Sequence, residues 1–461
     1  MDNPEQTQAS TPKPSRDPLD RDPVAPSRDI LQQLAGRVLD PGTAMRVKGV
    51  DPRPSAYVGH RLLVATQDLE SLFPILSEAA ALKGWEVTRD PDFTAWSITV
   101  PDPAKPDSEI TVGRTRLLID IASGRASSAP DAWVLLQLAR ANSGVEALRG
   151  ASLDHILTTV PFYDPHPFYD PHPFYDPHPF YDPHPVGSYG SPGSGGRQPV
   201  AFAGAAPHRH DKLPTLRPVV AILDSGVGSH PWLDRAVTEG VKLDLLDIGN
   251  VDPATDPEAH PDLAGPLDGI IDHNSGHGTF IAGLVHQACP DADIISWRLV
   301  DSEGPVAQSE WELAISRVVE LARRYHVGRS DGQRIDVLSL SMGYFHETAA
   351  DIQDTEVGKI LLGALGVMGT VVVCAAGNES TARPRFPAAL GPWRDAPVPP
   401  AAHLLPIVSV GALNPNGTDA LFSNTGPWVR SWATGAAVVS TMPMFQGGLL
   451  PRARVVYEGH V

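Results

Sequence analysis

The sequence has few cysteines and no long apolar run. Only two of its 461 residues are cysteine, Cys289 and Cys374, which is too few for a disulfide framework. Each lies in an apolar segment, so we expect both to be buried thiols. No apolar stretch reaches the length of about 20 residues that a membrane span needs, and the first residues lack a basic-then-apolar export signal. We therefore expect a cytoplasmic protein that does not enter a membrane.

Basic residues are also scarce relative to acidic ones. The chain has 36 Lys and Arg against 54 Asp and Glu, and its net charge is −18. Binding to nucleic acid requires a basic face, so this balance argues against a nucleic-acid partner. The hydrophobic content of 42% is that of a globular chain able to build a sizeable core.

Proline, in contrast, is abundant and clustered, and it divides the chain into four parts. Residues 1–56 are rich in Pro, Asp, Ser and Arg, which predicts a disordered arm. Residues 57–160 have the apolar periodicity of a small α+β domain. Residues 161–213 form a Pro- and Gly-rich linker, and residues 214–461 form a second, larger domain.

Apolar spacing in the small domain predicts alternating strands and helices. In order, these are a strand over 61–66, a helix over 69–80, strands over 93–100 and 109–123, a helix over 130–141 and a strand over 153–160. The order β-α-β-β-α-β is that of a ferredoxin-like domain.

The linker contains the unit FYDPHP four times without change, from Phe162 to Pro185. Proline at this frequency blocks helix and sheet and favours a polyproline II conformation, with three residues per turn. Three interpretations stay open, namely a stiff linker, a ligand for a partner protein, and a histidine ladder that binds metal. That ladder would consist of His166, His172, His178 and His184.

The larger domain alternates apolar strands with helices. Strands are predicted over 217–224, 292–300, 335–343, 370–378 and 405–413, and helices from His277 and over 309–325 and 355–369, with Ser309 as an N-cap. Strands rich in Val, Ile and Leu that alternate with helices indicate a doubly wound, mostly parallel α/β sheet with helices on both faces. Active sites of such sheets lie at the carboxyl ends of the strands.

Polar residues stand at three such positions. Asp224 ends the strand AILD, and Asn378 ends the strand VVVCAAGN. His277 opens a helix in SGHGTFIAG, where flanking glycines leave its ring accessible. A histidine placed against a carboxylate is a suitable general base, and an asparagine amide can donate to an oxyanion. Taken singly, each residue is equally compatible with an ordinary turn or helix start.

Two further segments have the pattern of a peptide-binding groove. LSLSMG is a strand end with alternating small polar residues, which could pair with an extended peptide. The residues concerned are Ser339, Leu340, Ser341, Met342 and Gly343. Gly304, in VDSEGP, could supply the opposite wall. Sheet and loop without a binding role is the alternative for both.

In this order, the motifs resemble those of the subtilisin-like serine peptidases. The motifs are VAILDSGV, SGHGTFIAG, VLSLSMG, AAGNES, FPAAL and FSNTGPW, within residues 217–443. The resemblance implies an Asp-His-Ser triad with Asp224 orienting His277, and His277 transferring the proton. It implies that Asn378 forms part of the oxyanion hole and that a polypeptide substrate lies between the segments of Gly304 and Gly343.

The serine of that triad is missing. The family carries it in a Gly-Thr-Ser motif, and the chain contains no such sequence. None of the later serines precedes a small-residue helix; they are Ser380, Ser409, Ser423, Ser431 and Ser440. We therefore expect a truncated or inactive peptidase without its C-terminal helices, with the serine encoded downstream or supplied by a second chain. The alternative is a non-catalytic pseudo-peptidase that binds peptides or acts as a scaffold.

Two smaller expectations follow from the resemblance. The order of the domain at 57–160 is similar to that of the inhibitory propeptides of this family, although an unrelated adaptor module fits equally well. The acidic stretch 247–262 could ligate calcium, as family members often do, although it lacks a recognisable ligand spacing. No other cofactor is expected.

Overall fold

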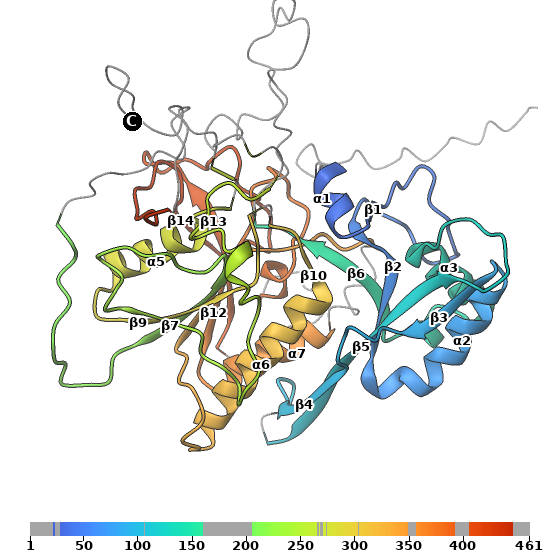
Figure 1. The fold of residues 1–461 in the computed structure, drawn as a ribbon, viewed down its shortest axis with the longest axis horizontal. Helices are drawn as coiled ribbons and strands as arrows, with labels where there is room; N and C mark the ends of the chain where they lie inside the picture. Colours follow the sequence, from blue (N-terminus) through green and yellow to red (C-terminus); the bar gives the residue numbers. More distant parts are fainter. Residues whose placement is uncertain are drawn as a thin grey trace, which may run out of the picture.

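The computed structural model of the chain contains two seven-stranded sheets (Figure 1). The residues described are 22–23, 28–105, 107–159, 205–264, 267, 271–272, 274–302, 304–348, 356–391 and 405–445. The FYDPHP repeats and their histidine ladder lie outside them.

The first sheet is antiparallel. Its strands are β1 (Gly36–Val38), β2 (Ala56–Ala65), β3 (Trp85–Arg89), β4 (Trp96–Pro101), β5 (Glu109–Ile121), β6 (Ala151–Leu157) and β10 (Val306–Ala307). The order is β10-β6-β2-β5-β3, with β1 beside β2 and β4 beside β5. Helices α2 (Leu69–Ala81) and α3 (Ala132–Ser143) pack their apolar sides into a core with β2, β5 and β6. Asp131 accepts a hydrogen bond from the Val134 amide and so caps α3.

The strands and helices predicted for this region are present. The structure adds one strand, β3, and ordered residues N-terminal to the predicted domain. Strand β3 was not predicted, because its residues WEVTR alternate over only five positions, too few to give a clear period. The long strand β5 pairs with β4 through its first half and with β3 through its second half. The disordered arm predicted over 1–56 is wrong for residues 28–56, which contain α1 (Arg28–Gln33), β1 and the buried side chain of Leu39.

The second sheet is parallel throughout. Its strands are β7 (Val219–Asp224), β8 (Val237–Glu239), β9 (Asp293–Arg298), β11 (Val337–Leu340), β12 (Val371–Ala375), β13 (Ile407–Leu413) and β14 (Ser431–Thr434). The order is β14-β13-β12-β11-β7-β9-β8. Helix α5 (His277–Ala288) covers one face, and α6 (Gln308–His326) and α7 (Glu356–Val367) cover the other. The predicted α/β class, preceded by a small α+β region, is confirmed.

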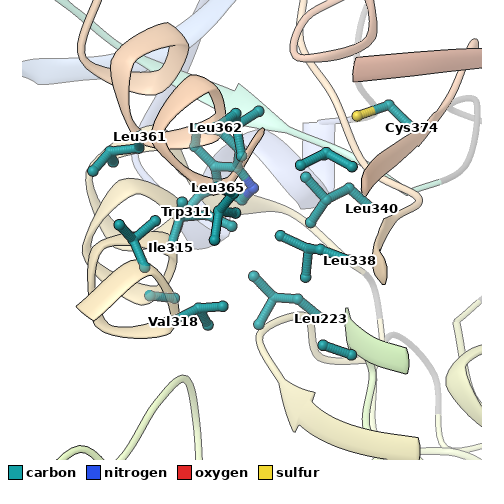
Figure 2. Close-up of a cluster of buried hydrophobic side chains, with 14 of the residues drawn as sticks. Leu223, Trp311, Ile315, Val318, Leu338, Leu340, Leu361, Leu362, Leu365 and Cys374 are labelled. Carbon is teal, nitrogen blue, oxygen red and sulfur yellow. The ribbon is translucent and has the colours of Figure 1, made fainter. Parts of the chain in front are cut away.

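Helices α6 and α7 lie between the two sheets (Figure 1). Leu223, Leu338 and Leu340 of the parallel sheet face α6 and α7 in one buried cluster (Figure 2). The same cluster includes Val100 and Leu157 of the antiparallel sheet. This cluster therefore joins the two sheets, and a second cluster lies between the antiparallel sheet and its own helices. Among the residues described, four 3-10 turns connect the elements. These turns are Thr66–Asp68, Glu146–Leu148, Pro253–Thr255 and Ala388–Leu390.

Two sequence expectations need correction. Cys374 is fully buried, and burial raises the pKa of its thiol to about 12, but Cys289 is partly exposed. Ser309 is not the N-cap of α6, which begins one residue earlier; its amide and hydroxyl both donate to Asp154 of β6, at 2.9 Å. The cap is therefore a carboxylate supplied by the other sheet. No helix in the described part of the chain combines the length and apolarity of a membrane span.

Candidate active site

Asp224 and His277 are in direct contact at the carboxyl edge of the parallel sheet. Asp224 is the last residue of β7 and is 1% exposed, while His277 is the first residue of α5. His277 Nδ1 lies 2.6 Å from Asp224 Oδ1, and the Ser225 amide donates to the same oxygen at 2.8 Å. The carboxylate fixes the proton on Nδ1, so Nε2 carries the lone pair that a general base needs.

Glycines allow α5 to start against β7. Gly276 has a φ of +81°, which favours glycine. A Cβ on Gly278 would lie 1.9 Å from the carbonyl oxygen of Gly226, so no larger residue fits there. Gly228 donates its amide to Thr279 Oγ1 at 2.7 Å and ties the two segments together. This close approach places the ring of His277 at the carboxylate of Asp224.

A buried carboxyl group that the sequence did not reveal lies behind this pair. Glu258, within the acidic stretch 247–262, is 2% exposed. Its oxygens accept hydrogen bonds from Ser225 Oγ and Thr279 Oγ1, both at 2.5 Å, and from the Gly278 amide at 3.1 Å. Burial raises its pKa to about 8, and the nearby Asp224 adds to the shift. Burial therefore favours the protonated form of Glu258 near neutral pH, which limits the negative charge beside Asp224.

The rest of the acidic stretch is bound by an arginine. The guanidinium of Arg298, at the end of β9, donates to the backbone carbonyls of Asn250, Asp252 and Thr255. Carbonyl oxygens of such a loop are typical calcium ligands, and here a side-chain cation contacts them. Calcium binding at this stretch remains a prediction.

Asn378 lies in a loop three residues beyond the end of β12, on the same sheet edge as Asp224. Asn424, in the FSNTGPW motif, fixes that loop. Its Oδ1 accepts from the amides of Glu379 and Thr381 at 3.0 and 3.1 Å, and its Nδ2 donates to Ala376 at 2.9 Å. The loop therefore has a defined shape, and Asn424 is a positioning residue that sequence reasoning missed.

The two groove walls differ from the expectation in detail. Ser339 and Leu340 belong to β11, and Ser341, Met342 and Gly343 follow it. Leu340 and Met342 are each 1% exposed and belong to the core, so a peptide could reach only their backbone. Gly304 has a φ of +81°, and a Cβ on it would lie 1.8 Å from Asn274 Nδ2. The opposite wall is therefore built on a position that requires glycine.

The end of β6 runs between these two walls. On one side, Ile156 and Leu157 pair antiparallel with β10, which follows Gly304. On the other side, Thr158 and Gly343 exchange both backbone hydrogen bonds, at 2.9 and 3.0 Å. The groove predicted for a peptide is thus filled by an extended strand of the chain itself.

Three further contacts lead this strand toward the Asp224–His277 pair. Arg385 Nη2 donates to the Thr158 carbonyl at 2.6 Å. Thr159 Oγ1 donates to Asn274 Oδ1 at 2.6 Å, and the Asn274 carbonyl accepts from the His277 amide at 3.0 Å. Asn274 therefore links the strand to the start of α5.

Four of the candidate serines make structural hydrogen bonds. Ser380, Ser409 and Ser440 donate from Oγ to the backbone carbonyls of Leu421, Trp428 and Phe280, each at 2.6 Å. Ser423 Oγ accepts from the Ala412 amide at 2.9 Å and contacts the Asn424 carbonyl. Ser431 lies in β14, at the far edge of the sheet from β7. These contacts match scaffold roles and not that of a nucleophile.

Comparison with known sequences identifies the parallel-sheet region. Residues 217–441 match the model of the subtilase family. Mycosin-4 of Mycobacterium tuberculosis is 31% identical over 242 residues, which cover 50% of this chain and 48% of that protein. The major intracellular serine protease of Bacillus subtilis is 27% identical over 242 residues, 50% of this chain and 62% of that protein. The chain spans about half to three fifths of the length of these relatives.

Among solved structures, a cold-adapted subtilisin-like serine proteinase shares 18% identity, with a TM-score of 0.32 over 49% of this chain and 65% of that one. A lanthipeptide protease shares 19% identity, with a TM-score of 0.31 over 47% of this chain and 55% of that one.

Proposed function

Because residues 217–441 belong to the subtilase family, we propose that this chain carries the Asp-His half of a serine endopeptidase. The enzyme hydrolyses peptide bonds of polypeptide substrates, and its nucleophilic serine comes from outside these 461 residues, in sequence that follows them or in a second chain. The observation that carries the proposal is the 2.6 Å contact between His277 Nδ1 and Asp224 Oδ1.

The residues have distinct roles in this mechanism. His277 Nε2 removes the proton from the serine hydroxyl as it attacks the scissile carbonyl, and returns it to the leaving amine. Asp224 holds the ring and stabilises the imidazolium that forms. Asn378 donates its side-chain amide to the oxyanion. Glu258 accepts hydrogen bonds from Ser225 and Thr279 and so holds the end of β7 against the start of α5.

We further propose that the region of residues 57–160 inhibits this groove, and does not act as an adaptor. The support is the course of Ile156–Thr159, which occupies the space between Gly304 and Gly343 where a substrate would lie. In this arrangement the peptidase domain binds substrate only after β6 leaves the groove. The cytoplasmic location expected from the sequence stays a prediction.

The alternative is a pseudo-peptidase that binds peptides. The absence of Gly-Thr-Ser from the 461 residues favours it. Its groove would use the same backbone of Gly343, without a chemical need for Asp224 and His277.

The test begins by reading the DNA and transcript 3′ of the Val461 codon in all frames, together with the neighbouring genes. If a Gly-Thr-Ser motif followed by a small-residue helix is found, the extended chain and the 461-residue chain are both treated with a fluorophosphonate, which labels nucleophilic serines. We expect labelling of the extended chain only, and its loss in His277→Ala, because the serine is activated by that base.

Two results would contradict the proposal. Labelling of the 461-residue chain that depends on His277 would place the serine within it. A folded extended chain that resists labelling even after removal of residues 57–160 by limited proteolysis would show that the triad does not function. If no frame or neighbouring gene encodes the motif, the peptide-binding alternative replaces the enzyme.

A further inference from the structure

Three electron-pair donors meet in a buried cluster away from the Asp224–His277 pair. His155 lies on β6, and His346 and Glu347 lie in the loop after β11. Their exposed fractions are 1%, 4% and 0%. One donor atom from each lies within 4.8 Å of the other two. The cluster therefore joins the antiparallel sheet to the parallel-sheet region at a point closed to bulk water.

A chain of hydrogen bonds fixes which nitrogen of His155 faces the cluster. Arg114 donates to Glu312 Oε2 at 2.7 Å, and Gln308 Nε2 donates to Glu312 Oε1 at 2.9 Å. This orients Gln308 so that its Oε1 faces His155 Nδ1, at 2.6 Å. Nδ1 must therefore carry a proton and donate it, and in a neutral ring the lone pair is on Nε2.

Nε2 points at a carboxylate and forms a hydrogen bond with it. His155 Nε2 is 2.5 Å from Glu347 Oε2, and His346 Nδ1 is 3.3 Å from the same oxygen. His346 Nδ1 accepts a long hydrogen bond from the amide of Thr348, at 3.5 Å. At this distance a proton lies between His155 Nε2 and Glu347 Oε2, and a cation bound among the three side chains would take the place of that proton.

We propose that this cation is a divalent transition-metal ion of the zinc class, bound by His155, His346 and Glu347. Two imidazoles and one carboxylate form a donor set that Zn²⁺ prefers, with bonds of about 2.0–2.2 Å. Donors in a tetrahedral shell of that size are about 3.3 Å apart. His346 Nδ1 and Glu347 Oε2 already have this separation, and His155 Nε2 and Glu347 Oε2 would move apart from 2.5 Å as the metal replaces the proton. Glu347 Oε1 has no hydrogen-bond partner among the described residues and can serve as the fourth donor.

Hydrogen bonds hold the backbone of the loop that carries His346 and Glu347. Ser55 Oγ donates to the Phe345 carbonyl, Arg383 Nη2 to the His346 carbonyl and the Arg53 amide to the Glu347 carbonyl, each at 2.6 Å. Two of these three donors come from the antiparallel-sheet region. Such second contacts hold ligating side chains in place and strengthen metal binding.

The ion has a structural consequence. It cross-links β6 to the loop after β11, three residues from the point where Thr158 pairs with Gly343. Bound metal therefore fastens the strand that fills the groove, and metal release loosens it. This consequence rests on the proposed function, whereas metal binding itself does not.

The experiment measures zinc in the full chain refolded with and without Zn²⁺. The repeats could bind metal too, so the starting protein has their histidines replaced by asparagine. These are His166, His172, His178 and His184. We expect about one Zn²⁺ per chain by mass spectrometry, a higher melting temperature with metal, and a tetrahedral visible spectrum when Co²⁺ replaces it.

Two variants remove one ligand from each side of the cluster. Glu347→Gln keeps the shape and lets its amide donate to His155 Nε2, and His155→Gln keeps an acceptor and a donor. Both should lower the zinc content at least tenfold and abolish the metal-dependent rise in melting temperature. The matched control, His326→Gln, changes an exposed histidine at the end of α6 and should keep the metal.

The outcomes distinguish a metal ion bound by the cluster from a proton held between His155 and Glu347. Zinc retained by folded Glu347→Gln, or no zinc in the starting protein, would overturn the proposal and leave His155 as an imidazolium paired with Glu347. If Glu347→Gln does not fold, the His155→Gln chain decides. The readout is metal content, so failure of this proposal and failure of the peptidase assignment are distinguishable.

Discussion

The two sheets are stabilised in different ways. The parallel sheet buries apolar strands between α5 on one face and α6 and α7 on the other, and its functional polar groups stand at one edge. The antiparallel sheet has its own helices on one face only. Its other face meets α6 and contains buried charged groups, among them Arg114, Arg116 and Asp154. Apolar packing is therefore the main stabilisation of the parallel sheet, whereas the antiparallel sheet also depends on paired charges where it meets α6.

This difference has an energetic meaning. Burial of apolar strands stabilises a fold with little regard to partner identity, whereas buried ion pairs tolerate only the correct partner because desolvation is costly. The paired charges therefore make the boundary specific, in addition to the apolar contacts that Val100 and Leu157 make there. Such a boundary is consistent with the inhibitory role proposed for residues 57–160.

The largest effect is expected from breaking the boundary at Arg114. Arg114 and Glu312 are 2% and 0% exposed and 2.7 Å apart, so Arg114→Met leaves a buried carboxylate without its cation. We expect a loss of about 3–5 kcal/mol in the free energy of unfolding, measured with urea. Arg89→Met, in the exposed pair with Glu70, is the control and should cost about 1 kcal/mol or less. Equal costs would show that the buried charges at the boundary do not depend on their partners.

The next effect concerns apolar contacts on either side of the boundary. Leu157 and Leu338 are each 0% exposed in the shared cluster, and replacing either by alanine should cost about 2–5 kcal/mol. Leu338→Ala acts on the parallel core, so it should lower global stability. Leu157→Ala acts at the groove, so it should also speed amide exchange at Gly343. If Leu157→Ala leaves that exchange unchanged, β6 does not hold the groove.

A smaller effect is expected from Glu258, whose titration should make the free energy of unfolding depend on pH. Its pKa is about 8 in the fold against 4.5 for an ordinary glutamate. Between these values the folded chain keeps a proton that the unfolded chain loses, so stability falls as pH rises, by roughly 1 kcal/mol per pH unit. Glu258→Gln removes the titrating group. Its stability should therefore be flatter from pH 5 to pH 8, and an unchanged slope would show that Glu258 is ionised in the fold.

The smallest effect concerns the two thiols of the parallel-sheet region. Cys289 is partly exposed, whereas Cys374 is buried with a pKa of about 12. Because the thiolate is the reactive form, a thiol reagent should modify one cysteine in the native chain and both after unfolding. Mass spectrometry identifies the site, and early modification of Cys374 would contradict its place in the core.

The parallel sheet could be predicted from sequence, because each strand is an apolar run that ends in a polar motif. The pairing of Asp224 with His277 is implied only by the resemblance of the motifs to a known family, and the structure shows the contact itself. The place of Glu258 could not be predicted. It lies in an acidic stretch that has the composition of a solvated loop, and it is buried because Ser225 and Thr279 supply hydroxyl donors. In the sequence, the hydroxyls of Ser225 and Thr279 beside Asp224 and His277 indicate only that these donors need a buried acceptor, and they do not identify it as Glu258.

The role of β6 was hidden for a related reason. Its sequence ASLDHIL places Asp154 and His155 in the middle of a short strand, which is typical of an edge strand facing water. Every residue of β6 is buried instead. The partners that allow this burial, Ser309 and Glu347, lie more than 150 residues away in the chain. Local pattern carries no information about such distant partners.

The most direct test of the account is hydrogen–deuterium exchange at the amides of Thr158 and Gly343 in the intact chain. These two amides donate to each other's carbonyls across the groove. If β6 fills the groove, both should exchange as slowly as the amides of β11, and Leu157→Ala should release both together. Exchange of the Gly343 amide at the rate of an exposed loop would show an open groove and contradict the account.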